Sequence, residues 1–421
     1  MDLTLIVVLV IGLALFFDFT NGFHDTANAM ATPIATGAIK PKAAVALAAV
    51  LNLVGAFLST EVAKTISGGL IREGDGGIAI TPEMIYAGLM GAVLWNMVTW
   101  LLGLPSSSSH ALFGGLIGAA IVGAGFGAVS YAVLLSKVIL PALLAPLIVG
   151  VSAFVCTRLA YRITKRQAGT SPKRGGFRVG QIFSSSLVAL SHGTNDAQKT
   201  MGVITLTLIA SGAQAAGTGP QFWVVVACAL AIALGTYAGG WRIIRTMGAG
   251  LTEVKPAQGF AAEVSTGVAI LASSHLGFAL STTQVASGSV IGSGLGRKGA
   301  HVRWGVAGRV GLGWLLTLPA AGAVGALAAF TAHLGAWGLA LVTVVGIGAL
   351  LFIWYLSRKD RVGHHNAVEV EDAAQAVDIP SKRERKLRRK RTEREAALAS
   401  SRAGADTAPG AQQDHTTEGN R

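Results

Sequence analysis

The stretch FHDTANAMAT, residues 23–32, returns in altered form as GTNDAQKTMG at residues 193–202. A second pair follows each of them: LPSSSSHALFGGLIGA at 104–119 and ALSTTQVASGSVIGSG at 279–294. The spacing is nearly the same, with Ser108 83 residues after Asp25 and Thr282 86 residues after Asp196. Two motifs in the same order at nearly equal spacing indicate a tandem duplication.

The composition around these motifs is that of a lipid-embedded chain. Of the 421 residues, 52% are hydrophobic and only 13% are charged, whereas soluble domains carry about 25% charged residues. The 55 glycines lie mostly in apolar runs, where small residues let membrane helices approach closely. The two cysteines lie far apart and predict neither a disulfide framework nor a metal site.

Loop charges predict how the chain crosses the membrane. Most of the net charge of +13 lies in loops of the apolar part, which indicates membrane topology rather than nucleic-acid binding. The basic loop 157–178 is expected in the cytoplasm and the acidic loop 61–83 outside. The segment 241–258 occupies the place of 61–83 in the second copy, yet it is basic. The two copies are therefore predicted to be inverted, with a site at their interface near the midplane.

We predict an all-α polytopic membrane protein with two inverted-topology repeats, discontinuous or re-entrant helices, and about 10–12 membrane segments. Residues 1–39 and 179–217 are each too long for one straight span, so a break is expected in both. The predicted organisation is a first membrane repeat at 1–157, a basic cytoplasmic linker at 158–178, a second inverted repeat at 179–330, an extra membrane helix at 331–357, and a basic, mostly disordered cytoplasmic tail at 358–421.

Five stretches of this chain resemble motifs of the PiT family of inorganic phosphate transporters. They are FHDTANA, SHGTNDAQKTMG, PSSSSHALFGG, LSTTQVASGSVIG, and TEVKPAQGFAAE at 252–263. The resemblance covers roughly residues 10–325. It implies a bacterial low-affinity type in the plasma (inner) membrane that imports inorganic phosphate, or a metal–phosphate complex, with H⁺ or Na⁺. It implies no cofactor besides that ion, and it leaves a homodimer open.

Two carboxylates carry the predicted cation site. A carboxylate at membrane depth is costly, so it usually faces a cavity and has a partner. A lone Asp can instead cap a helix, but Asp25 and Asp196 occupy duplicated motifs. Their carboxylates, with the amides of Asn28 and Asn195, suit Na⁺, and the carboxylates can alternatively carry H⁺. If the ion is Na⁺, Asp25 and Asp196 are its expected metal ligands.

His24 favours the proton. Many members of the PiT family have Asn at this place, and the His–Asp pair resembles a bacterial branch associated with proton coupling. A histidine beside Asp25 can relay protons near neutral pH. The alternative is a neutral histidine that is hydrogen-bonded within the bundle.

The hydroxyl motifs carry the predicted phosphate site. Ser and Thr at a helix start cap free N–H groups, and such N–H groups also bind anions, assisted by the helix dipole. Two such starts brought together would hold a tetrahedral oxyanion, whose charge a bound cation offsets. The predicted phosphate-binding residues are Ser107, Ser108, Ser109, Gln198, Ser281, Thr282 and Thr283.

Other polar residues near the motifs are subsidiary candidates. Lys199 can contact phosphate, pair with Asp196, or extend to an interface. Asp18 is compatible with a secondary site or a helix cap. The further candidates are Thr32, Thr200 and His110, and no role is assigned to His192.

Three other functions compete with phosphate symport. Sulfate is a similar oxyanion, but phosphate keeps a proton and can donate it to a carboxylate, which favours phosphate. A hydrolase would need a nucleophile and a base within hydrogen-bond reach of each other. The sequence has no Gly-x-Ser-x-Gly elbow, and the adjacency of Ser and His in SSSSH does not make such a pair. A channel would not require paired carboxylates. The sequence therefore predicts a transporter and not an enzyme, with Na⁺-coupled phosphate symport or sulfate transport as alternatives.

Overall fold

The computed structural model describes residues 3–71, 80–166, 174–359 and 362–364. Within these ranges the chain is almost entirely helical, and the β-structure amounts to two isolated bridges, Ile71–Val129 and Thr252–Val302. The prediction of an all-α protein is confirmed. Most of the tail at 358–421 lies outside the described residues.

The helices form two series with the same order and similar lengths. The first series is α1 (Leu3–Ala35), α2 (Pro41–Gly55), α3 (Glu61–Thr65) with a π-helical turn (Ile66–Leu70), α4 (Pro82–Leu101) and α5 (Ser108–Ala124). The second is α8 (Arg174–Ala210), α9 (Phe222–Ala238), α10 (Trp241–Arg245) with a π-helical turn (Thr246–Gly250), α11 (Pro256–His275) and α12 (Thr282–Gly296). Helices α6 (Tyr131–Val133) and α7 (Leu140–Arg166) follow the first series, and α13 (Trp304–Ala332) and α14 (Ala336–Ser357) follow the second.

The first helix of each series is continuous. The expected break in residues 1–39 and 179–217 is wrong, because α1 and α8 each run through their motif without interruption. A helix satisfies its own backbone groups, and the polar side chains of the motifs find partners on other helices. Among the described residues, a sharp bend lies instead between α9 and the segment Trp241–Gly250, at 59°.

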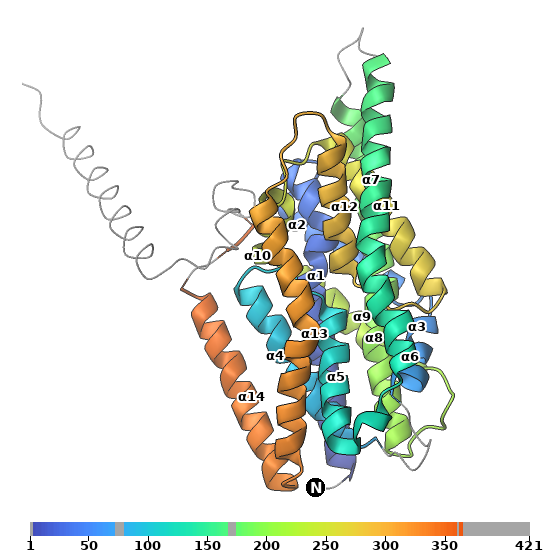
Figure 1. The fold of residues 1–421 in the computed structure, drawn as a ribbon, viewed down its shortest axis with the longest axis vertical. Coiled ribbons are helices and arrows are strands. Elements are labelled where there is room, and N and C mark those ends of the chain that lie inside the picture. Colours follow the sequence, from blue (N-terminus) through green and yellow to red (C-terminus); the bar gives the residue numbers. More distant parts are fainter. Residues whose placement is uncertain (1–2, 72–79, 167–173, 360–361, 365–421) are drawn as a thin grey trace, which may run out of the picture. The chain divides into compact units, whose positions relative to one another are not determined.

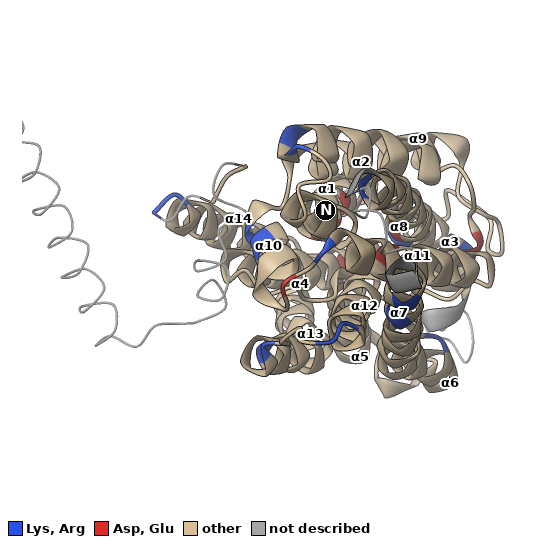
Figure 2. Ribbon diagram, turned by 90° about the horizontal axis from the view of Figure 1, so that it is seen from above, with Lys and Arg blue, Asp and Glu red and all other residues tan. Residues whose placement is uncertain are grey.

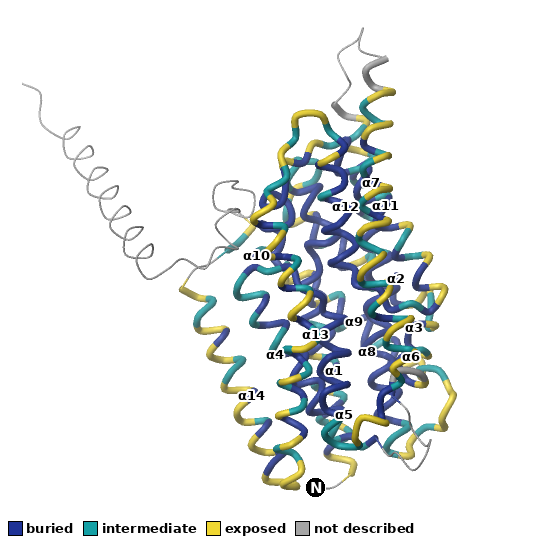
Figure 3. Tube along the Cα trace, in the orientation of Figure 1, coloured by how far each residue is buried: buried dark blue, intermediate teal, exposed yellow. Residues whose placement is uncertain are grey.

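Long apolar helices surround a polar interior. Among the described residues, five helices are long and apolar enough to cross a membrane, or six if the bent pair is one span. Figure 3 shows exposed residues along the outer helices α7 and α14 and buried residues in the interior. The exposed residues of the outer helices include large apolar ones, such as Leu147 and Val344, as expected for a surface in lipid. The total of 10–12 membrane segments stays a prediction.

Each series packs against the other rather than only against itself. A Cβ atom on Gly22 of α1 would lie 2.3 Å from the carbonyl oxygen of Ile232 on α9. Equivalently, a Cβ on Gly193 of α8 would lie 2.3 Å from the carbonyl oxygen of Asn52 on α2. Glycine permits this close approach of helix backbones. The first helix of each series thus packs on the second helix of the other series.

Directions and charges distinguish the two ends of the bundle. In Figure 1, α1 begins at the bottom, near the N-terminus, and α8 begins at the top, where α7 ends. Figure 2 views the bundle from that upper end and shows Lys and Arg on α7 and α10. An open groove formed by α7 and the loops before α11 and after α12 is lined by the cations Arg158, Arg162, Lys255, Arg297 and Lys298.

Candidate functional site

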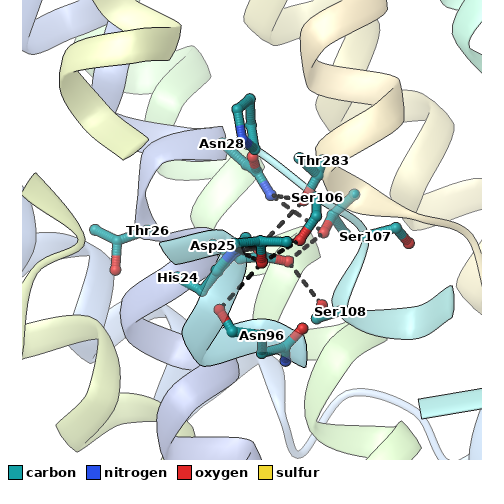
Figure 4. Close-up of polar contacts among 12 residues, drawn as sticks. His24, Asp25, Thr26, Asn28, Asn96, Ser106, Ser107, Ser108 and Thr283 are labelled. Atoms are coloured by element: carbon teal, nitrogen blue, oxygen red, sulfur yellow. Dashed lines mark hydrogen bonds and ion pairs between the residues drawn. The ribbon is translucent and has the colours of Figure 1, made fainter. Parts of the chain in front are cut away.

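The predicted polar residues gather where α1 and α8 meet the first turns of α5 and α12. All of them are buried, with at most 7% of any residue exposed. Figure 4 shows Asp25 in the middle, with Asn28, Thr283 and Ser108 around it. The residues that the fold brings together are His24, Asp25, Asn28, Ser108, Ser109, Asn195, Asp196, Lys199, Thr282 and Thr283.

Asp25 accepts hydrogen bonds from both hydroxyl motifs. Its Oδ2 lies 3.0 Å from the hydroxyl of Ser108 and 3.1 Å from that of Thr282. Its Oδ1 lies 3.2 Å from the Thr283 hydroxyl and 2.7 Å from Nδ1 of His24. Three hydroxyl groups from two helix starts therefore converge on this one carboxylate.

Asp196 has a fixed cation as its partner. The ammonium of Lys199 forms an ion pair with Oδ1 of Asp196, which also accepts from Nδ2 of Asn195 at 2.7 Å. The Thr282 hydroxyl lies 3.1 Å from Oδ2 of Asp196 as well as 3.1 Å from Oδ2 of Asp25. Its single proton can serve one carboxylate at a time, so Thr282 links the two halves of the site.

The two copies exchange contacts within the site. Nδ2 of Asn28 on α1 donates to the hydroxyls of Thr282 and Thr283 on α12, at 3.3 and 3.1 Å. Nζ of Lys199 on α8 donates to the hydroxyl of Ser109 on α5 at 2.6 Å. Each first motif thus contacts the hydroxyl motif of the other copy.

Equivalent places in the two copies carry different chemistry. Aligned on their aspartates, Asn28 corresponds to Lys199, and His24 corresponds to Asn195. The carboxylate of the second copy therefore has a permanent positive partner. The carboxylate of the first copy has a histidine instead, with Nδ1 of His24 at 2.7 Å from Oδ1 of Asp25.

His192 joins the site although the sequence analysis gave it no role. Its Nε2 lies 3.0 Å from Oδ2 of Asp196 and 3.9 Å from Oδ2 of Asp25. Asp25, His192 and Asp196 each offer one ligand atom for a metal ion. These three atoms lie within 4.8 Å of one another, which is close enough to hold one cation. The spacing contained a signal, because His192 precedes Asp196 by four residues and so lies one helical turn away on the same face.

Ser107 and Ser281 act as helix caps. The hydroxyl of Ser107 accepts from the backbone N–H of His110 at 3.2 Å, and that of Ser281 from the N–H of Gln284 at 3.3 Å. The side chains of His110 and Gln284 meet at 3.4 Å. The cap explains these two serines, and the residues that follow each of them face the carboxylates.

Gln198 lies apart from the carboxylates. Its Nε2 donates to the carbonyl of Thr194 at 2.5 Å, and its Oε1 accepts from the N–H of Val62 at 2.8 Å. Nε2 is thus bonded within α8 and Oε1 at the start of α3, so this side chain holds α3 against α8.

Thr32 contacts a third buried carboxylate. Its hydroxyl donates to Glu263 on α11 at 2.5 Å, and Glu263 also accepts from Gln181 at 3.0 Å and from Ser184 at 2.5 Å. A small cavity beside these residues is lined by both Asn28 and Glu263. Glu263 was missed as a site residue, although it ends the quoted motif TEVKPAQGFAAE.

A buried set of hydroxyls, amides, carboxylates and one lysine between two similar helical series is the arrangement of a membrane transporter. The profile described as "Phosphate transporter family" matches residues 21–174 and 163–325. The chain belongs to this family, as the motifs indicated, and its relatives are named as transporters rather than enzymes.

Two relatives and one solved structure show how far the similarity extends. A protein of Mycobacterium tuberculosis (strain ATCC 25618 / H37Rv), named "Probable low-affinity inorganic phosphate transporter", is 54% identical over 374 residues, which are 87% of this chain and 88% of that protein. A Bacillus subtilis (strain 168) protein of the same name is 41% identical over 337 residues, 78% of this chain and 98% of its own. A structure titled "The sodium-dependent phosphate transporter" has a TM-score of 0.70 at 23% identity and covers 78% of this chain and 99% of its own, so it shares the fold.

Proposed function

We propose that this protein imports inorganic phosphate together with H⁺ across the plasma membrane by alternating access. The relatives are named as low-affinity inorganic phosphate transporters. One observation carries the coupling: the hydroxyls of Ser108, Thr282 and Thr283, all predicted to bind phosphate, donate to the carboxylate of Asp25.

Competition for these hydroxyls couples the two substrates. An ionised Asp25 holds Ser108, Thr282 and Thr283 as charge-assisted donors, which are stronger than neutral ones. Protonation of Asp25 removes that charge, so the hydroxyls can turn to the oxygens of a phosphate ion. The protonated carboxyl gains an O–H group of its own and can donate it to the anion. Proton binding at Asp25 thereby prepares the phosphate site.

The charges of the site favour a proton over a metal cation. Lys199 already neutralises Asp196, so Asp25 is the carboxylate whose charge remains to be balanced. His24 contacts it at 2.7 Å, and an imidazole can both accept and donate a proton. Carrying phosphate without this proton would leave excess negative charge in a medium of low dielectric constant, which is costly. Phosphate and proton are therefore expected to move together.

The two series are proposed to be inverted repeats. The opposite starting ends of α1 and α8 (Figure 1) and the exchanged packing of the first two helices support this. Rocking of one packed group of helices against the other would expose the site to each side in turn. The end that carries the basic groove is proposed to face the cytoplasm.

Uptake of radiolabelled phosphate into proteoliposomes of the purified protein tests the proposal. Either a pH gradient or a Na⁺ gradient is imposed, with excess unlabelled sulfate present. We expect saturable uptake that the pH gradient drives and sulfate leaves unchanged. Uptake driven only by Na⁺ would overturn proton coupling, and transport of sulfate or a metal–phosphate complex in its place would overturn the substrate.

A further inference from the structure

One face of α1 is polar well beyond the central site. Positions three and four apart lie on one face of a helix, and five such positions in α1 are polar and buried: Asp18, Asn21, Asp25, Asn28 and Thr32. The stripe is about 21 Å long at the usual rise per residue. The equivalent positions in α8 are Ala189, His192, Asp196, Lys199 and Val203. The second copy is thus polar only at the centre, whereas α1 continues the polarity in both directions.

Asp18 begins this stripe on the N-terminal side of the site. It lies seven residues before Asp25, so about 10 Å along the same face of α1. Its side chain is fully buried, and neither carboxyl oxygen has a hydrogen-bond partner within normal geometry among the described residues. The same holds for both polar side-chain atoms of Asn21. The hydroxyl of Thr200 on α8 faces Asp18 and interacts with its carboxyl, although outside normal hydrogen-bond geometry. Asp18 lies in the middle of α1 and so is not a helix cap.

These surroundings suit a carboxyl group that binds a proton. An ionised carboxylate without a partner is costly at membrane depth, and the neutral form costs far less. The charged and titratable groups that face Asp18 are Asp196 and Lys199 on α8 and Cys228 on α9. Lys199 is already paired with Asp196.

We propose that Asp18 is a second proton-binding site, at which the coupling proton is held on its way between the N-terminal end of α1 and the His24–Asp25 pair. The role in coupling rests on the proposed phosphate–proton symport. The binding of a proton at Asp18 does not, because it follows from the burial and the missing partners of this carboxyl.

Infrared difference spectra of the purified full-length protein in lipid, recorded over a pH series, test proton binding directly. A protonated carboxyl has a C=O stretch that is separate from the carboxylate bands. Besides any signal from Asp25, we expect a signal from Asp18 that titrates in the wild type and persists in Asp25→Asn. It should vanish in Asp18→Asn and shift in Asp18→Glu. Spectra of Asp18→Asn identical to the wild type at every pH would overturn the proposal. A signal that Na⁺ removes at constant pH would overturn it in favour of a metal cation.

Transport separates the role of Asp18 from the proposed function as a whole. Asp18→Asn is expected to lose pH-driven accumulation of phosphate but to keep exchange of labelled for unlabelled phosphate, which needs no net proton movement. Asp18→Glu is the matched control and should restore accumulation. A wild type that transports no phosphate would refute the symport while leaving the infrared result to stand. Normal accumulation in Asp18→Asn would refute the role of this carboxyl in coupling.

Discussion

Asp25 and Asp196 are equivalent in the duplicated sequence, yet they have different partners. Asp196 forms an ion pair with Lys199, whereas Asp25 contacts His24. The motifs were sufficient to single out both carboxylates and the hydroxyls, but they did not show that Ser108, Thr282 and Thr283 hydrogen-bond to Asp25. They could not show which ion pair forms, because Lys199 had three alternatives of equal merit until the positions of Ser109 and Asp196 were known.

Replacement of Asp25 separates coupling from folding. Asp25→Asn removes the exchangeable charge but keeps the shape of the side chain and an oxygen that accepts the surrounding hydroxyls. We expect accumulation of phosphate under a pH gradient to fall to the background of empty liposomes. Elution from a size-exclusion column should match the wild type, and accumulation at the wild-type rate would contradict the role of Asp25.

Replacement of Asp196 is expected to affect stability as well. Asp196→Asn leaves Lys199 as an unpaired buried charge, and breaking a buried pair in this way costs about 3–5 kcal/mol. The double variant Asp196→Asn with Lys199→Met removes both charges and should recover most of that loss. Thermal unfolding of the two variants in detergent measures the difference. Equal melting temperatures would show that the pair is not the stabilising partner inferred here.

At the scale of helices, the contacts between α1 and α9 depend on one small residue. A Cβ atom on Gly22 would lie 2.3 Å from the Ile232 carbonyl oxygen, whereas one on Gly12 of the same helix meets nothing within 4 Å. Gly22→Ala should therefore destabilise the protein by about 1–3 kcal/mol, the usual cost of overpacking. Gly12→Ala should be neutral or stabilising, since alanine favours helices. Unfolding temperatures of the two variants check this, and an equal response would contradict the close packing.

The helices were only partly predictable. The hydroxyl motifs predicted the helix starts of α5 and α12, because Ser and Thr cap free N–H groups there. The expected break in α1 and α8 was wrong. It rested on the length of residues 1–39 and 179–217, but each helix continues through the polar residues of its motif. Their side chains instead find partners on other helices, a tertiary property that the local sequence does not contain. Glu263 was missed for the same reason.

At the scale of the whole molecule, the basic groove predicts orientation. Lys298 lies in the connection between α12 and α13 at that groove, and Ala216 lies in the connection after α8. In a variant without Cys156 and Cys228, a single cysteine at Ala216 should react with a membrane-impermeant maleimide in intact cells. A single cysteine at Lys298 should react only after permeabilisation. The reverse pattern would place the groove outside.

The duplication was visible in the sequence, but the exchange between copies was not. Repeats reveal that two halves share a structure, and loop charges suggest their opposite orientation. Neither shows that Asn28 contacts Thr282 and Thr283, which lie 254 and 255 positions later in the chain. Such contacts follow only from the folded arrangement of both halves.

That separation has a consequence for how the protein is made. While the ribosome is still producing the second half, Asn28 and Asp25 have already entered the membrane. The α12 hydroxyls that form hydrogen bonds with them have not yet been synthesised. The nascent chain must keep these polar groups at the translocon or near water until residue 283 has been synthesised. A chain truncated before α12 would expose them to lipid and become a target for membrane quality control.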